Sequence, residues 1–373
     1  MSYAEKRIAK LRASMSDQGC NLFYVRAVSN IQWLTAFDEV FDTEEAHALI
    51  VTEDEVVLHT DSRYMDAALR AASATKIKVN AQARTHASLL FEITGTQSSR
   101  RQGPSIIGIE SSISLAEYRS LEKEMQQSSL TASLKETQGL VYNLRAVKDE
   151  EEIARMRAAQ AITDAAYSHI VRFIRPGMTE REVQIELEDF MVRHGAGGLA
   201  FSSIVASGAN AALPHAIPGQ SILEPGQTIV LDFGARLGSY CSDMTRTVFI
   251  GEPEQRIRHA YEALREANES VEAFLRPGVT GAQAQELAES ILERAGFGGA
   301  MGHSLGHGVG LDVHEEPVLA PRNKQALVAG NVITVEPGIY FADEFGMRLE
   351  DFGVITENGF EVFTQSSHEM VIL

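Results

Sequence analysis

The chain has 373 residues, of which 44% are hydrophobic, and a formal net charge of −18 at pH 7. This length provides for about two domains with sizeable cores. The acidic charge argues against nucleic acid as a partner, because a nucleic-acid backbone requires a basic face. No apolar run approaches the roughly 20 residues of a membrane span, so we expect no membrane association.

The start of the chain also suggests a cellular compartment. Residues 1–19 carry charges throughout and lack the apolar core of a signal peptide. The sequence contains only two cysteines, Cys20 and Cys241, which makes a disulfide framework improbable. Both observations indicate a reducing cytoplasm.

The first 140 residues alternate helical and strand patterns. Helices are predicted near 3–18, from about 63, near 88 and from 114, and strands at NLFYV, HALIV, EVVLHT, IKV and SIIGIE. This pattern is typical of a small α/β domain, and it contains no glycine-rich phosphate loop. A long charged helix begins in LRAVKDEEEIARMRAA. We therefore predict one domain at 1–140 and a second at 141–373.

The second domain contains an internal repeat. RPGMTEREVQIELEDFMVRHGAGG aligns without gaps with RPGVTGAQAQELAESILERAGFGG. In each copy Pro-Gly ends one helix and a threonine begins the next: Thr179 with Glu182, and Thr280 with Gln283, have the spacing of a capping box. Each copy leads into a β-rich region, which predicts a pseudo-twofold α+β domain with a central antiparallel sheet. Because only two copies are visible, a helical solenoid is disfavoured.

An acidic pair follows the first copy. In TIVLDFGARLGSYCSDMTRTVFIG, β-rich runs flank Leu237 and Gly238, a pattern typical of a β-hairpin. A turn at these two residues places Asp232 directly opposite Asp243, with their Cβ atoms only about 4.5 to 5.5 Å apart. Like charges in this arrangement are destabilising unless a cation lies between them.

A second acidic pair follows the second copy. In VITVEPGIYFADEFGMRLEDFGVI, a turn centred on Asp343 places Glu336 opposite Glu350. The glycine-rich segment HSLGHGVGLDVHEEP lies between the two hairpins and brings an imidazole near the acids. A single Asp or Glu is more often a solvated strand residue. Four clustered carboxylates, however, would have to take up protons at neutral pH unless cations are present.

Two divalent ions would neutralise this cluster. Paired ions roughly 3.5 to 4 Å apart are a recurrent hydrolytic device. Oxygen-rich ligands with one imidazole favour manganese, iron or cobalt, with zinc possible.

These motifs resemble those of a known family. LDFGARLGSYCSDMTRT, GHSLGHGVGLDVHEEP, VEPGIY and MRLED, with ASGANAALPHA upstream, are similar to the motifs of the M24 metallopeptidases of pita-bread fold. Within that family they most resemble the Xaa-Pro peptidases, prolidase and aminopeptidase P. The resemblance extends from about Leu144 to the C-terminus and more weakly through the N-terminal part. It implies an α+β fold: a pita-bread domain after a smaller α/β, creatinase N-terminal-like domain.

The resemblance also implies a set of two metal ions and their ligands. Asp232 would bind one metal, Asp243 and Glu350 would bridge both, and His307 would supply the imidazole. Glu336 would bind metal and also transfer protons. Of the candidate metals, manganese is favoured, with cobalt, iron or zinc possible.

Four further residues receive roles from the same resemblance. His215 and His314 would contact the substrate and the tetrahedral intermediate, and His303 would lie near the substrate. Arg348 would order a ligand carboxylate such as Asp232, as residues behind metal ligands commonly do.

The implied reaction is hydrolysis of the N-terminal Xaa-Pro peptide bond by a hydroxide that bridges the metals, on short peptides with proline second. Glu336 would pass a proton to the leaving nitrogen, and His314 would stabilise the oxyanion. In the family, the N-terminal domain helps to form a homodimer and partly covers the partner's site. Asn30, Trp33 and Tyr64 are candidates for that contact, although core packing is the stronger interpretation of Trp33.

The substrate length and two other functional classes stay open. Prolidases often place an arginine after HE-x-P to hold the carboxylate of a dipeptide, whereas this chain has Val318. This slightly favours an aminopeptidase P-like enzyme, although another arginine could hold a dipeptide. A metal-free creatinase-like hydrolase and a non-catalytic peptide-binding pita-bread protein are the alternatives, but both should have gaps among the five ligand positions. Methionine aminopeptidase is disfavoured by the large N-terminal domain and the context of His303.

Overall fold

The computed structural model describes residues 2–38, 40–42, 46–99 and 103–373. The chain divides into two compact units, residues 1–145 and 146–373. The first unit ends with α6 (Leu140–Arg145), which packs on α1 (Tyr3–Asp17). The boundary predicted from the sequence, between residues 140 and 141, falls at the start of this helix. In the described part of the chain no helix is long and apolar enough to cross a membrane.

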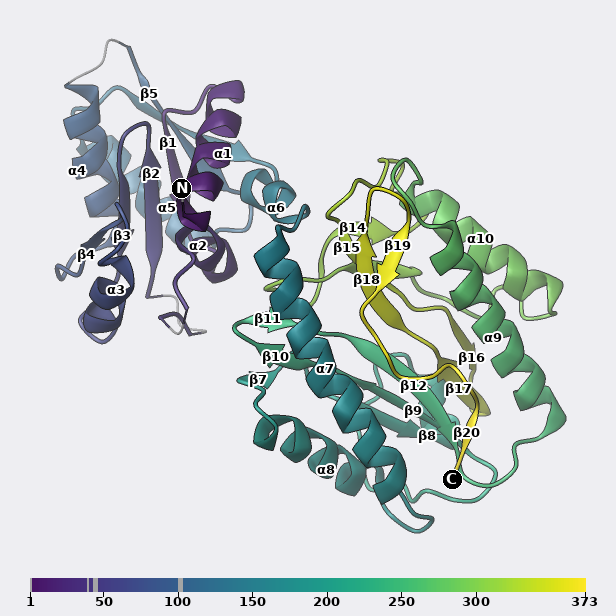
Figure 1. The fold of residues 1–373 in the computed structure, drawn as a ribbon. Helices are drawn as coiled ribbons and strands as arrows, with labels where there is room; N and C mark the ends of the chain where they lie inside the picture. Colours follow the sequence, from purple (N-terminus) through teal and green to yellow (C-terminus); the bar gives the residue numbers. More distant parts are fainter. Residues whose placement is uncertain (1, 39, 43–45, 100–102) are drawn as a thin grey trace. The chain divides into compact units, whose positions relative to one another are not determined.

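The first unit is built around a mixed sheet that has, within the described residues, the strand order β4-β3-β2-β1-β5-β6 (Figure 1). Strand β1 pairs antiparallel with β2 and parallel with β5, and its four residues are all buried. The other helices of this unit are α2 (Val28–Thr35), α3 (Met65–Ala72), α4 (His86–Ser98) and α5 (Leu115–Gln127). The strands of the unit are β1 (Leu22–Val25), β2 (Ala48–Thr52), β3 (Val56–His59), β4 (Lys78–Asn80), β5 (Ser105–Glu110) and β6 (Ala132–Thr137).

The second unit consists of two halves, each with a pair of helices packed on strands. Figure 1 shows α7 and α8 on one side of the strands and α9 and α10 on the other. The first half contains α7 (Glu150–Phe173), α8 (Glu180–Arg193), β7 (Gly198–Leu199), β8 (Ile204–Ser207), the 3₁₀ helix η1 (Gly208–Ala212), β9 (Thr228–Phe233), β10 (Ala235–Leu237), β11 (Tyr240–Cys241) and β12 (Met244–Phe249). The second contains α9 (Gln255–Phe274), α10 (Gly281–Arg294), β13 (Gly306–Gly308), β14 (Glu315–Leu319), β15 (Val332–Val335), β16 (Gly338–Phe341), β17 (Phe345–Arg348), β18 (Asp351–Ile355) and β19 (Phe360–Val362). The last strand, β20 (Val371–Ile372), pairs with β12 in the sheet of the first half.

The predicted repeat is visible in the structure, and with it the pseudo-twofold α+β architecture is confirmed. Helices α8 and α10 have the same length, 14 residues, and each begins with a complete capping box. The Oγ1 atoms of Thr179 and Thr280 accept hydrogen bonds from the third helical backbone N–H at 3.2 Å in both copies. Local sequence therefore determines both helix starts in the same way.

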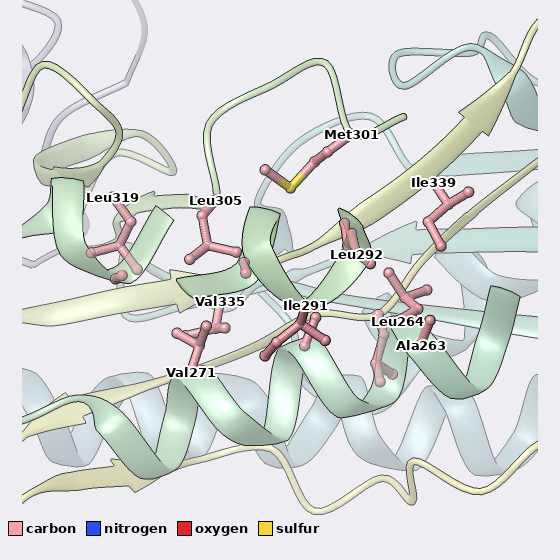
Figure 2. Close-up of a cluster of buried hydrophobic side chains, with 14 of the residues drawn as sticks. Ala263, Leu264, Val271, Ile291, Leu292, Met301, Leu305, Leu319, Val335 and Ile339 are labelled. Atoms are coloured by element: carbon pink, nitrogen blue, oxygen red, sulfur yellow. The ribbon is translucent and has the colours of Figure 1, made fainter. Parts of the chain in front are cut away.

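The core of the second half holds the strand that leads into the second acidic pair. Leu264 and Val271 of α9 and Ile291 of α10 are buried against Val335 and Ile339, which lie on either side of Glu336 (Figure 2). Burying each such side chain stabilises the fold by about 1.5 to 3 kcal/mol relative to exposure. The acid is thus carried on a segment fixed by its apolar neighbours.

The strand register of the first hairpin differs from the prediction. Strands β9 and β12 pair so that Asp232 faces Thr245, not Asp243. The predicted direct opposition of the two aspartates is therefore wrong by two positions. A two-residue shift keeps each side chain on its original face of the ladder, and the Asp232 and Asp243 carboxylates remain close enough to repel each other.

The reason for the shift is the turn. Leu237 pairs with Tyr240, so the turn residues are Gly238 and Ser239. Both have positive φ, 52° and 68°. A two-residue hairpin of this kind needs φ above zero at both central positions, which glycine adopts without the steric cost that leucine would have. Leu237 therefore stays in the strand.

The second hairpin has the predicted register. Val335 faces Asp351 in one sheet and Gly338 faces Arg348 in the next. The same alignment, continued through the break between the two sheets, sets Glu336 opposite Glu350. Asp343, with φ 62°, occupies the turn.

Candidate metal centre

The structure gathers the five predicted ligand residues at the middle of the second unit, where strands of both halves meet. Thr245 and Glu350 form an isolated β-bridge between the halves. These candidate ligand residues lie at or next to strand ends: Asp232 in β9, Asp243 before β12, His307 in β13, Glu336 after β15 and Glu350 before β18.

The spacing of the ligand atoms suits a cation. Single ligand atoms of Asp243, His307 and Glu350 all lie within 4.8 Å of one another. His307 Nε2 lies 3.7 Å from Asp243 Oδ2 and 3.4 Å from Glu336 Oε1, longer than a good hydrogen bond. Atoms that share one ion at about 2.0 to 2.2 Å are separated by distances of this size.

The carboxylates of the cluster repel one another. Burial, and then repulsion from neighbouring carboxylates, raises the pKa values of Asp243 and Glu350 well above their ordinary range. Burial also raises the pKa of Glu336 to about 7. Among the described residues, the buried Oδ1 of Asp232 has no hydrogen-bond partner. An orphaned oxygen beside crowded carboxylates fits a site for divalent cations, which would satisfy both.

His307 is oriented for ligation. Its Nδ1 donates a hydrogen bond to Gly308 O at 3.0 Å, so Nε2 faces the carboxylates. Its backbone N–H donates to Thr334 Oγ1 at 3.0 Å. Burial lowers the pKa of His307. The ring is thus held in the neutral form that binds metals, with the tautomer set by a backbone carbonyl.

Arg348 contacts one of the ligand residues, as the resemblance implied. Its Nη2 donates to Asp232 Oδ2, and its Nε donates to Thr245 Oγ1 at 3.0 Å. Thr245 in turn donates from Oγ1 to Glu350 Oε2 at 2.7 Å. One guanidinium therefore reaches two of the carboxylates, one directly and one through a hydroxyl.

The three predicted substrate-side histidines also lie around the cluster. The His314 ring is 4.4 Å from that of His307, centroid to centroid. His215 is exposed but close enough to act electrostatically on both His303 and His314. Burial lowers the pKa values of His303 and His314. All the candidate site residues are therefore neighbours, and their roles remain proposals.

Sequence reasoning missed Tyr340. His303 Nδ1 donates to Ser304 O at 2.8 Å, which leaves Nε2 to accept from Tyr340 OH at 3.2 Å. The same hydroxyl accepts from Arg348 Nη1 at 2.6 Å. The one available signal was the position of this tyrosine in VEPGIY, directly across the hairpin from the arginine strand.

A buried ion pair next to His314 was missed as well. Lys148 Nζ lies 2.9 Å from Glu315 Oε2, and their side chains are 1% and 3% exposed. Glu315 Oε1 also accepts from the backbone N–H of Asp312 at 3.1 Å. The pair therefore fixes the segment that carries His314. Because the partners are 167 residues apart, local patterns could not pair them.

A second acidic group lies behind Glu350. Ligand atoms of Glu272, Asp351 and His368 come within 4.8 Å of one another. Here the chain supplies the cation itself, because Arg246 Nη2 lies 2.7 Å from Asp351 Oδ1. Burial would raise the pKa of Asp351, but Arg246 and His368 outweigh it and hold the value at about 2. This group is a structural ion-pair network.

The residues suggested for contact with a partner lie in the first unit. Trp33 is 2% exposed, so its core packing is confirmed. Asn30 is buried, and its Nδ2 donates to Glu110 Oε1 at 2.5 Å. Tyr64 OH donates to Asp42 Oδ2 at 2.6 Å.

Comparisons with known proteins agree with this architecture. Residues 154–357 match the model of metallopeptidase family M24, and residues 7–147 match the creatinase/prolidase N-terminal domain. The chain belongs to metallopeptidase family M24. The resemblance seen in the sequence motifs is confirmed.

Several relatives of this M24 metallopeptidase match over most of their length. An uncharacterized peptidase of Bacillus subtilis is 34% identical over 369 residues, 98% of this chain and 100% of the relative. The Xaa-Pro dipeptidase of Pyrococcus furiosus is 36% identical over 265 residues, 71% of this chain and 75% of the relative.

Solved structures are similar over both units. The Xaa-Pro dipeptidase from Bacillus anthracis has a TM-score of 0.90 at 33% identity, covering 99% of this chain and 100% of that one. The X-Pro aminopeptidase from Thermotoga maritima has a TM-score of 0.84 at 33% identity, covering 97% and 100%. The predicted fold, a pita-bread domain preceded by a creatinase-like domain, is confirmed.

Proposed function

We propose that this M24 metallopeptidase hydrolyses the bond between the first residue of a peptide and a proline at the second position. The proposal rests on a cluster of three buried carboxylates and the partly buried Glu336 around one neutral imidazole. Relatives named Xaa-Pro dipeptidase and X-Pro aminopeptidase support the substrate class. The residues that would hold two divalent cations are Asp232, Asp243, His307, Glu336 and Glu350.

When bound, divalent cations lower the pKa of a coordinated water toward about 7 and polarise a substrate carbonyl. Glu336 would take the proton of the attacking water and deliver it to the proline nitrogen that leaves. Thr334 supports this role, because its Oγ1 donates to Glu336 Oε1 at 3.3 Å and orients the carboxylate.

The substrate side of the site is formed by histidines. His314 packs on the His307 ring, one ring away from the ligand cluster, and would stabilise the oxyanion that develops on the carbonyl. His215 would contact the substrate from its exposed loop. His303 accepts a hydrogen bond from the Tyr340 hydroxyl, which also accepts one from Arg348. His303 would therefore line the site next to Arg348.

Val318 bears on the length of the substrate. It lies in β14 immediately after the HEEP segment, and its carbonyl accepts from Asn323 Nδ2 at 2.8 Å. An apolar side chain here offers no cation for the terminal carboxylate of a dipeptide. We therefore favour an aminopeptidase P-like preference for Xaa-Pro-Yaa peptides over Xaa-Pro dipeptides.

The test is metal analysis of the purified protein together with an activity panel of Xaa-Pro, Xaa-Pro-Yaa and Met-Ala-Yaa peptides, with and without chelator. We expect bound divalent metal, manganese foremost, and chelator-sensitive cleavage of the proline peptides. Cleavage that survives exhaustive chelation would indicate the metal-free hydrolase instead, and binding without turnover would indicate the peptide-binding module.

Two variants sharpen the test. Glu336→Gln should lower kcat by at least about 10²-fold, since it removes the proton carrier. Glu344→Gln is the matched control, because Glu344 lies exposed at the tip of the same hairpin, where it pairs with Arg256. A Glu336→Gln enzyme with near-normal kcat would contradict the assignment.

We further propose a cytoplasmic homodimer. Two free cysteines, Cys20 and Cys241, agree with a reducing compartment. Sedimentation equilibrium of the full chain tests the assembly, and a concentration-independent monomer mass would overturn it.

A further inference from the structure

We propose that Glu180 is a positioning residue that holds the loop bearing His215 against the site. The inference rests on the proposed function, in which His215 contacts the substrate. Glu180 is the first residue of α8, outside the ligand cluster, and its exposure is 0%. A fully buried carboxylate needs strong partners, because burial without hydrogen bonds is costly.

The hydrogen-bond donors to the Glu180 carboxylate come from the segment 207–219. Its Oε1 accepts from Ser207 N at 2.7 Å and from Ser207 Oγ at 3.0 Å. Its Oε2 accepts from Asn210 Nδ2 at 2.9 Å and from Gly219 N at 3.0 Å. These donors lie at the two ends of the segment, and His215 lies between them. One carboxylate thus closes the loop at both ends, with charge-assisted hydrogen bonds.

The helix start adds two backbone contacts. The N–H of Glu180 donates to Ser221 O at 3.1 Å, and the N–H of Arg181 donates to Gly219 O at 3.0 Å. These N–H groups belong to the first turn of α8, which has no partners for them inside the helix. The carbonyl groups of Gly219 and Ser221 accept hydrogen bonds from these N–H groups. The positive end of the helix dipole also stabilises the Glu180 carboxylate.

On its other side, the loop packs against β17, the strand that ends at Arg348. A Cβ atom at Gly346 would lie 1.9 Å from Ala211 O, so η1 sits directly on the backbone of β17. Arg348 Nη1 also donates to Pro214 O at 3.4 Å. The loop is therefore clamped between the Glu180 carboxylate and the strand that carries the guanidinium of the site.

The loop presents alternate residues outward. Ala216 and Pro218 are buried, whereas Leu213 and Ile217 are 58% and 81% exposed. His215 lies between these two apolar side chains and is exposed like them. Since the outward residues have solvent on one side, the position of the imidazole depends on the anchors at the ends of the loop.

The repeat shows that α8 does not need Glu180 in order to fold. The aligned position in the second copy is Gly281, where a Cβ atom would lie 2.3 Å from Val318 O. Helix α10 nevertheless has the same length and the same capping box as α8. The carboxylate at position 180 therefore serves the loop of the first half and not the helix.

The experiment compares Glu180→Ala and Glu180→Gln with His215→Ala and with the double variant Glu180→Ala/His215→Ala. Glu182→Ala is the matched control, since Glu182 lies exposed in the same helical turn and only caps the helix. Kinetics on an Xaa-Pro-Yaa peptide and thermal unfolding are measured for each. Hydrogen exchange is followed on peptides covering 207–219.

We expect Glu180→Ala to lower kcat/KM by roughly tenfold or more, because a displacement of about 1 Å in a site costs up to 10²-fold. Glu180→Gln should lose less, since its amide oxygen still accepts. In the His215→Ala background, Glu180→Ala should have no additional effect, because the two residues act through one group. Exchange in 207–219 should rise in Glu180→Ala and stay unchanged in Glu182→Ala.

Losses that multiply in the double variant would overturn the proposal, as would unchanged exchange in Glu180→Ala. Faster exchange with normal kcat/KM would overturn it too, since the loop would then be held without consequence for the site. If the wild type cleaves no Xaa-Pro peptide, the proposed function fails. The exchange result then decides alone whether Glu180 holds the loop.

Discussion

Arg348 Nη2 donates a hydrogen bond to Asp232 Oδ2, and both residues are buried. A permanent positive charge is therefore built into the carboxylate cluster at one edge. It offsets part of the negative charge and fixes the direction of one carboxylate. Asp243 and Glu336 lie instead beside the neutral ring of His307, 3.7 Å and 3.4 Å from its Nε2.

Replacing Arg348 should weaken metal binding. We expect Arg348→Met to lower the affinity for Mn²⁺ about 10- to 100-fold, because residues behind metal ligands set their orientation. Calorimetric titration of the metal-free protein measures the change. Arg256→Met serves as control, since Arg256 is an exposed arginine that pairs with Glu344 at the tip of the same hairpin. Equal affinities in both variants would count against the role of Arg348.

Removing one acid should stabilise the metal-free protein. Asp243→Asn replaces a carboxyl whose ionisation is opposed by burial and by repulsion from Asp232 and Glu336. We expect a gain of about 0.5 to 2 kcal/mol in the free energy of unfolding in the presence of chelator, the range common for single stabilising substitutions. Conversely, Mn²⁺ at about 100 times its Kd should add about 2.7 kcal/mol to the wild type and less to the variant. Urea unfolding with and without metal measures both, and a variant less stable than the wild type without metal would refute the reasoning.

The buried pair of Lys148 and Glu315 should be intolerant of single changes. Lys148→Met leaves the Glu315 carboxylate buried without its cation, so we expect a loss of about 3 to 5 kcal/mol in the free energy of unfolding. Arg155→Met is a suitable control, because Arg155 forms a partly exposed pair with Glu151 on the helix that follows. Chemical unfolding distinguishes the two. Similar small losses in both variants would show that the buried pair has no special weight.

His368 should make stability depend on pH. Burial would lower its pKa, but the hydrogen bond and charge of Asp351 outweigh burial and raise it. Glu269, Glu272 and Arg246 also face the ring or its partner. A raised pKa gives stability that is fully present below the unfolded value near 6.5 and is lost as pH rises through the folded value. His368→Gln should therefore cost more at pH 6 than at pH 9, as measured by unfolding at both values, and a cost that grows with pH would reverse this sign.

Local signals in the sequence predicted the helix starts and one of the hairpins. The caps at Thr179 and Thr280 depend on residues three positions away, so the pattern alone determines them. The turn at Asp343 gave the right register for the second acid pair. The first hairpin failed because Gly238 could serve either as the second or as the first turn residue, and only the paired strands decide between these positions.

Contacts between segments far apart in the chain could not be predicted from the sequence. Nothing in the neighbourhood of Glu180 points to residues 207–219, and nothing near Lys148 points to Glu315. In both cases a buried carboxylate finds donors that only the folded chain brings near. The candidate ligand residues, by contrast, could be proposed from the sequence because each one belongs to a motif with its own strand context, and their role as ligands stays a prediction.

The division of ligands between the two copies of the repeat has a consequence for the origin of the protein. Asp232 and Asp243 follow the first copy, and Glu336 and Glu350 follow the second, with Thr245 bridging to Glu350 between them. One copy alone would hold half of a site, so an ancestral single unit would have needed to pair with another chain. Because the two halves are joined in one chain, each can carry residues that the other lacks. The contrast between Glu180 and Gly281 records this divergence.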